Sequence, residues 1–126
     1  MFLIILAAGK SERFENTIPK QYTKLGNKTI LEHSLDAFSD FKQIKKTIVV
    51  YNKKHKKYLK KINLKNIIKV EGGKLRQISV FKALKKIKNM NCKKVLIHDV
   101  ARPNASKNLI NNLLNKLQNN DAVIPV

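Results

Sequence analysis

The stretch Phe2-Leu3-Ile4-Ile5-Leu6, followed at once by Ala7-Ala8-Gly9, decides the fold class. An unbroken apolar run of this length is typical of a strand that is covered on both faces, as in a parallel sheet. No basic segment precedes the run, and it is far too short to span a bilayer. It therefore predicts a buried first strand, and it favours neither a signal peptide nor a membrane anchor.

Strand-like and helix-like segments alternate along the rest of the chain. Apolar and β-branched runs predict strands over residues 47–51, 67–70, 95–98 and 122–126. Apolar stripes predict helices over residues 30–41, 53–62, 80–87 and 109–117. Thr29 and Glu32 form a capping box for the first helix, Ser106 can cap the last, and Ser79 or Gln77 can open the third. This alternation predicts an α/β fold with a mostly parallel sheet and helices on both faces.

Composition places the chain among folded domains in spite of its charge. It has 126 residues, of which 43% are hydrophobic, and 27 Lys and Arg against 8 Asp and Glu, a formal net charge of +19. This size and apolar content are typical of one globular domain. The single Cys92 excludes an internal disulfide, and we expect a cytoplasmic protein with no membrane partner.

The positive charge has two interpretations. A strongly basic surface is typical of proteins that bind nucleic acids. However, 24 of the 27 basic residues are lysines spread along the chain, and lysine, asparagine and isoleucine are all favoured by A+T-rich codons. A biased genome would produce this charge without a functional cause, so we expect no specific nucleic-acid partner.

Three loops follow predicted strands at the edge where open α/β sheets bind ligands. Loop 1 comprises residues 7–13 and 19–22, loop 2 residues 71–80, and loop 3 residues 98–103. All three arginines of the chain lie in these loops, although lysine is used everywhere else. This placement indicates contacts that require a planar guanidinium.

Loop 1 combines small residues with positive charge. Ala7, Ala8 and Gly9 allow a ligand to approach the backbone closely, and successive N–H groups in such a turn can bind phosphate oxygens. Arg13 and Lys20 add positive charge over the same space. The alternative for Ala-Ala-Gly alone is an ordinary turn that ends a strand.

Loops 2 and 3 also carry unusual residues. Gly72 and Gly73 permit close approach to a base or a ribose, or they serve a turn that needs positive φ. Asp99, directly after a buried strand, is well placed for Mg²⁺ brought by a nucleotide, or it braces the loop by pairing with Arg102. We expect His98 to be structural.

Taken in order, these motifs resemble the 2-C-methyl-D-erythritol 4-phosphate cytidylyltransferase family. The matching residues are Ala7-Ala8-Gly9, Arg13, Pro19-Lys20-Gln21-Tyr22, Ile30 to Leu35, Gly72-Gly73, Arg76, Ser79-Val80, His98-Asp99 and Ala101-Arg102-Pro103. The resemblance covers all 126 residues and implies a Rossmann-like nucleotidyltransferase fold. It implies that residues 1–126 are the N-terminal, CTP-binding part of a single domain that is apparently truncated.

The resemblance also implies an enzyme of the non-mevalonate isoprenoid pathway. Such an enzyme transfers CMP from CTP to 2-C-methyl-D-erythritol 4-phosphate, a small sugar-alcohol phosphate, releases pyrophosphate, uses Mg²⁺ and is a homodimer at full length. Arg13 and Lys20 would be catalytic, and Asp99 would serve the metal. The residues implied to bind CTP are Ala7, Ala8, Gly9, Gly73, Ser79 and Arg102.

Three residues depart from the family pattern, and two other functions remain as alternatives. Ser11 replaces a second glycine, Lys74 replaces an acidic residue and Val100 replaces an alanine. The nearer alternative is a ribitol 5-phosphate cytidylyltransferase, which shares the nucleotide-binding half. The other is a basic nucleic-acid-binding domain. Because the chain stops just after Pro125, we expect an N-terminal portion of a longer protein. The resemblance implies that the residues that position the acceptor come from the missing second half, so we expect this chain to bind CTP weakly at best and to turn over nothing.

Overall fold

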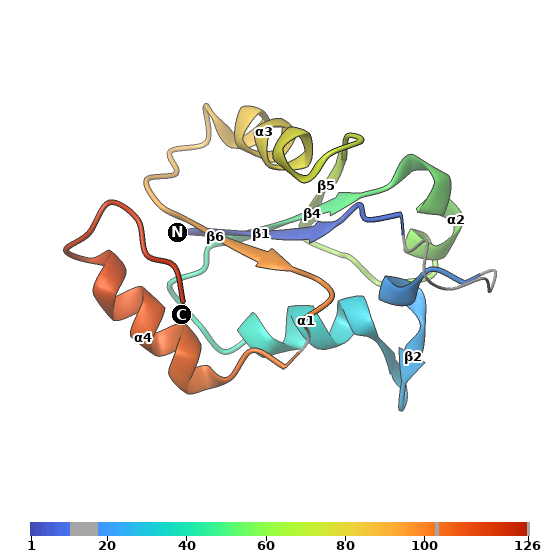
Figure 1. Cartoon of the computed structure of the whole chain (residues 1–126), viewed down its shortest axis with the longest axis horizontal. Coiled ribbons are helices and arrows are strands. Elements are labelled where there is room, and N and C mark those ends of the chain that lie inside the picture. Colours follow the sequence, from blue (N-terminus) through green and yellow to red (C-terminus); the bar gives the residue numbers. More distant parts are fainter. Residues whose placement is uncertain (11–17, 103, 126) are drawn as a thin grey trace.

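A computed structural model describes residues 1–10, 18–102 and 104–125 of the chain (Figure 1). Parallel strands form the central sheet in the order β5-β4-β1-β6, and β2 pairs with β3 in a separate antiparallel hairpin. The strands are β1 (Phe2–Ala7), β2 (Lys24–Leu25), β3 (Lys28–Thr29), β4 (Lys46–Tyr51), β5 (Ile67–Glu71) and β6 (Val95–Asp99). The α-helices are α1 (Ile30–Phe38), α2 (Lys56–Leu59), α3 (Arg76–Ile87) and α4 (Lys107–Leu117), and the 3₁₀ helices are η1 (Lys20–Tyr22) and η2 (Lys53–His55).

Strand β1 lies inside the sheet and is buried along its whole length. Successive side chains of a strand point to opposite faces, so β1 contributes to two cores. Leu3 and Ile5 pack on the face covered by α1 and α4, whereas Phe2, Ile4 and Leu6 pack on the face covered by α3 (Figure 1). The predicted parallel sheet with helices on both faces is confirmed.

Two of the predicted helix caps are present. The Thr29 backbone N–H donates to Glu32 Oε2 at 2.6 Å, and the Glu32 N–H donates to Thr29 Oγ1 at 3.2 Å, which completes the capping box of α1. At α4, the Leu109 N–H donates to Ser106 Oγ at 3.1 Å. Local side-chain chemistry therefore sets where these helices begin.

Two predicted helices are wrong in extent. The segment 53–62 forms only the short η2 and α2, and its lysines place like charges four residues apart, which disfavours a longer helix. Helix α3 begins one residue before Gln77, after Leu75 and not at Ser79. The Ser79 hydroxyl instead accepts a hydrogen bond from the Gly73 N–H, so it is engaged inside the helix.

The predicted last strand is also wrong for the residues that the structure describes. Residues 122–125 adopt no strand conformation, although their sequence is apolar. A strand needs a hydrogen-bonded neighbour, and local sequence does not show whether one is present. No helix in the described ranges is long and apolar enough to cross a bilayer.

Candidate functional site

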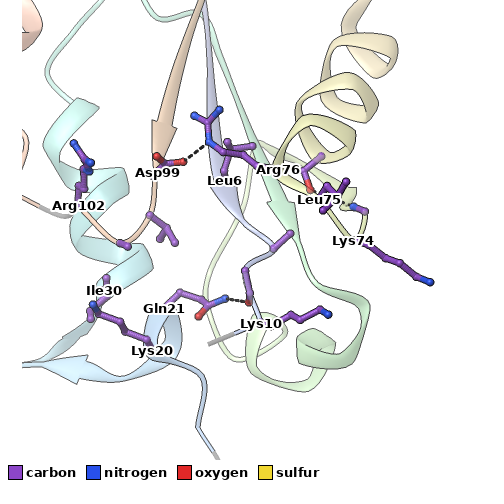
Figure 2. Close-up of a pocket in the computed structure, with 16 residues that line it drawn as sticks. Leu6, Lys10, Lys20, Gln21, Ile30, Lys74, Leu75, Arg76, Asp99 and Arg102 are labelled. Carbon is purple, nitrogen blue, oxygen red and sulfur yellow. Dashed lines mark hydrogen bonds and ion pairs between the residues drawn. The ribbon is translucent and has the colours of Figure 1, made fainter. Parts of the chain in front are cut away.

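A cavity of about 480 Å³ lies at the carboxyl edge of the sheet, where loops 1, 2 and 3 meet (Figure 2). Of the site residues expected from the sequence, those that line it are Ala8, Gly9, Lys20, Gly73, Ser79, Asp99 and Arg102. Arg13 and Ser11 lie outside the described residues. The Ala7 side chain packs in the core beneath the cavity.

Two side-chain amides hold the turn of loop 1 at residues 7–9, one from the second part of loop 1 and one from the end of β4. Gln21 Nε2 donates to the carbonyl oxygens of Ala7 at 2.8 Å and Gly9 at 3.1 Å, and Asn52 Nδ2 donates to that of Ala8 at 3.3 Å. A Cβ atom at Gly9 would meet no described residue within 4 Å. Within the described part of the chain, Gly9 therefore leaves space that a ligand can approach.

The short helix η1 carries residues with three different environments. Lys20 is exposed and lines the cavity, Gln21 is buried, lines the cavity as well and donates to the backbone of residues 7–9, and Tyr22 is buried. The Tyr22 ring stacks on Tyr58 with 5.7 Å between centroids. Burial, and to a lesser degree the neighbouring Tyr51, raises the pKa of Tyr22 to about 12. The buried ring thus anchors the segment that presents the lysine.

Loop 2 packs directly against loop 1. A Cβ atom at Gly72 would lie 2.5 Å from Ala8 Cβ and 2.8 Å from Ser79 Oγ. The Gly73 N–H donates to Ser79 Oγ at 3.1 Å, and Lys82 Nζ donates to the Gly72 carbonyl at 3.3 Å. Neither glycine has positive φ, so the interpretation of this loop as a turn that needs positive φ is wrong.

Loop 3 is tied to both helix faces of the sheet. Asp99 Oδ1 accepts from Arg76 Nε at 3.2 Å, and both side chains are partly exposed at the cavity (Figure 2). The backbone N–H of Arg102 donates to the Asp99 carbonyl at 3.0 Å. The buried Ser34 hydroxyl of α1 donates to the Val100 carbonyl at 3.2 Å. The Asp99 carboxylate therefore pairs with Arg76. The alternative prediction, an ion pair between Asp99 and Arg102 that braces the loop, is wrong.

His98, the first residue of loop 3, is partly buried and is not among the residues that line the cavity. Its ring packs edge-on against Phe38, with 5.0 Å between centroids. Burial lowers the pKa of His98, and a hydrogen bond to the Arg102 backbone partly opposes that effect. This environment agrees with the structural role expected for His98.

The carboxylates available for a metal ion are few. Within the described part of the chain, no three His, Cys, Asp or Glu side chains form a cluster. Mg²⁺ that accompanies a nucleotide needs only one or two protein carboxylates, because phosphates and waters supply the other ligands. Asp99, at the cavity wall, fits that requirement as a single ligand.

The amides of Gln21 and Asn52 were not among the candidate site residues. Gln21 lies within the quoted stretch 19–22, and Asn52 is the first residue after β4. Polar residues at the carboxyl end of a buried strand fall at the ligand-binding edge of such a sheet, which was the available signal for Asn52. No local feature of the sequence indicates that Gln21 donates to the carbonyl oxygen of Gly9, twelve residues earlier in the chain.

The whole chain, residues 1–126, matches the family model described as 2-C-methyl-D-erythritol 4-phosphate cytidylyltransferase. Among curated relatives, a bifunctional enzyme IspD/IspF of Pelagibacter ubique is 51% identical over 97% of this chain and 33% of its own length. A 2-C-methyl-D-erythritol 4-phosphate cytidylyltransferase of Wigglesworthia glossinidia brevipalpis is 44% identical over 90% of this chain and 50% of its own length.

Solved structures agree with these relatives. The bifunctional IspDF of Campylobacter jejuni superposes with a TM-score of 0.79 and 38% identity, over 92% of this chain and 30% of that one. The 4-diphosphocytidyl-2C-methyl-D-erythritolsynthase of Anaerococcus prevotii gives a TM-score of 0.72 and 32% identity, over 94% and 52%. The chain thus spans about a third to a half of the length of these proteins.

Proposed function

Because this chain belongs to the 2-C-methyl-D-erythritol 4-phosphate cytidylyltransferase family, we propose that residues 1–126 form the N-terminal, CTP-binding part of a nucleotidyltransferase domain. The proposed reaction transfers CMP from CTP to 2-C-methyl-D-erythritol 4-phosphate and releases pyrophosphate. The observation that carries the proposal is the cavity in which three loops, distant in sequence, meet. Its volume of about 480 Å³ lies in the range of small-molecule sites.

The walls of the cavity suggest how CTP would bind. Ala8 and Gly9 would contact the nucleotide through their backbone, which no side chain at Gly9 shields. Gly73, Ser79 and Arg102 would lie along the cytosine and ribose on the other walls. Ala7 would act through its backbone alone, since its side chain is buried.

The proposed chemistry is an in-line displacement at phosphorus. A phosphate oxygen of the acceptor forms a bond to the α-phosphorus of CTP, while the bond to pyrophosphate breaks and the leaving group takes the electron pair. Negative charge grows on the phosphoryl oxygens, so positioning and fixed cations matter more than a strong base. Lys20, and Arg13 from the same loop, would stabilise that charge. Mg²⁺ held by Asp99 would neutralise phosphate oxygens.

The alternatives have less support. Relatives from Wigglesworthia and Clostridioides difficile carry the methylerythritol name, which does not favour the ribitol phosphate acceptor. The basic charge remains compatible with non-specific binding to polyanions. A cytoplasmic location, a homodimer at full length and the absence of a specific nucleic-acid or membrane partner complete the proposal, and they are supported by the family resemblance.

Calorimetric titration of the chain tests the proposal. CTP with Mg²⁺ is compared with ATP and with a short DNA duplex at about 150 mM salt, where weak polyanion binding is screened. We expect selective binding of CTP, weakened about tenfold by Lys20→Ala and unchanged by Lys24→Ala, which alters an exposed lysine outside the cavity. Equal binding of all three ligands would contradict the proposal.

A further inference from the structure

Three consecutive carbonyl groups of loop 1 accept hydrogen bonds from side-chain amides. Gln21 reaches the first and the third of them, those of Ala7 and Gly9, and Asn52 reaches the carbonyl of Ala8 between them. The donors come from positions 12 to 44 residues away in the chain. The shape of this turn therefore depends on side chains outside it.

Fixing these carbonyl groups also fixes the neighbouring N–H groups. In a planar trans peptide the C=O and the following N–H point in opposite directions. No described peptide bond is cis, so the amides of Gln21 and Asn52 set the direction of the N–H groups of Ala8, Gly9 and Lys10. N–H groups in such a turn are those that bind phosphate oxygens. No described residue lies within 4 Å of the Cβ position of Gly9, so packing by this part of the chain does not set its orientation.

Gln21 is the stronger of the two donors. Its side chain is 3% exposed and both of its bonds are 3.1 Å or shorter, whereas the Asn52 bond is single and longer. In η1 it stands between Lys20, which lines the cavity, and Tyr22, which is buried. One amide thus connects η1, the segment that carries the lysine, to the turn at residues 7–9 (Figure 2).

We propose that Gln21 is a positioning residue, which holds the loop 1 backbone in the conformation that binds nucleotide phosphates and keeps Lys20 opposite it. The inference deepens the proposed function and rests on it. Gln21 lines the cavity, and in this proposal it transfers no proton. Its effect passes through the backbone of residues 7–10 and through η1.

Two substitutions separate the donor function of Gln21 from its volume. Gln21→Met keeps a similar volume and removes both donors. Gln21→Glu keeps the shape and turns an ionised oxygen toward the two carbonyl oxygens. We expect each variant to raise amide hydrogen exchange at Ala8, Gly9 and Lys10 and to weaken CTP binding about tenfold or more. Gln43→Met, at an exposed position between α1 and β4, is the matched control.

The pH dependence of Gln21→Glu gives a readout that a space-filling role would not produce. Burial between carbonyl oxygens raises the pKa of the new carboxyl group, and its protonated form regains one O–H donor. As the pH falls from about 8 to about 5, CTP affinity relative to the parent chain at the same pH should recover in this variant. It should not recover in Gln21→Met.

Amide exchange in the nucleotide-free chain and CTP titration by NMR give separate answers. Faster exchange confined to residues 8–10, with pH-dependent recovery in Gln21→Glu, supports the inference. Exchange at loop 1 that matches the parent chain in both variants overturns it, whatever the nucleotide result. If the parent chain binds CTP no better than ATP, the proposed function fails, while the exchange data still decide whether Gln21 orders the loop.

Discussion

Gly9 and Gly72 lie in neighbouring loops, but they are glycine for different physical reasons. Among the described residues, a Cβ at Gly9 meets nothing within 4 Å, whereas one at Gly72 would lie 2.5 Å from Ala8 Cβ. The turn of loop 1 at residues 7–9 is held by hydrogen bonds from the side-chain amides of Gln21 and Asn52. Loop 2 is held by direct packing of its own backbone. A glycine in a ligand-binding loop therefore serves either the ligand or the fold, and substitution can distinguish the two.

Gly72→Ala should have the largest effect, and it should be an effect on folding. The backbone cannot withdraw, because the Gly72 N–H donates to the Tyr51 carbonyl at 2.8 Å and the Gly72 carbonyl accepts from Lys82. Overpacking of this kind costs about 2 kcal/mol in the free energy of unfolding. Urea denaturation measures it, and a loss below about 0.5 kcal/mol would remove the distinction between the two glycines.

Gly9→Ala should have the next largest effect, and it should be an effect on binding. A methyl group there occupies space that the ligand would use, so we expect CTP affinity to fall about tenfold, ~1.4 kcal/mol. The free energy of unfolding should stay within about 0.5 kcal/mol of the parent value, because Gly9 does not have positive φ and its Cβ position has no close neighbour among the described residues. Calorimetry with CTP measures the affinity, and urea denaturation measures the free energy of unfolding. Unchanged CTP affinity would contradict the assignment of this space to the ligand.

The same contrast explains how much of the molecule the sequence could predict. The apolar run at residues 2–6, the capping box at Thr29 and the cap at Ser106 are local signals, and each was confirmed. Open α/β sheets bind ligands at their carboxyl edge, and this rule predicted that the three loops form one site. Residues from all three loops line the cavity. These predictions depend on chain-local chemistry or on topology alone.

Features that depend on distant partners could not be predicted. Ser79 looked like a helix cap, but its hydroxyl binds the Gly73 N–H. Residues 122–125 looked like a strand, but strand formation depends on a neighbour. The hairpin of β2 and β3 was missed although its loop, Gly26-Asn27, is a known hairpin signal and Gly26 has a φ of 72°. The sequence indicated most of the residues that line the candidate site, and it did not indicate the hydrogen bonds that the Gln21 amide donates to residues 7 and 9.

Tyr22→Phe tests whether loop 1 depends on the buried support beneath η1. Among the described residues, the Tyr22 hydroxyl is buried without a hydrogen-bond partner, so its removal should stabilise the chain by up to about 1 kcal/mol at neutral pH. The pKa is raised from 10.0 to about 12 on folding, which means that folding favours the neutral phenol. The stabilisation that this provides is complete below pH 10 and is lost as the pH rises toward 12.

Denaturation at several pH values compares the two chains, since lysine titration in this range affects both. The advantage of Tyr22→Phe in the free energy of unfolding should grow between pH 10 and 12. A constant difference between the chains across that range would show that Tyr22 ionises as easily when folded as when unfolded. The segment of loop 1 that presents Lys20 would then lack the buried anchor assigned to Tyr22.

Arg76→Met should have the smallest effect, and it tests whether packing alone holds loop 2. The ion pair with Asp99 spans 3.2 Å, but the two side chains are 60% and 42% exposed, and pairs of this kind contribute about 0.5 kcal/mol or less. Arg76 also opens α3, where its charge opposes the helix dipole and offsets part of that attraction. We expect a change within about 0.5 kcal/mol in urea denaturation, smaller still at high salt. A loss near that of Gly72→Ala would mean that charge, and not the close approach of Gly72 to Ala8, sets the shape of loop 2.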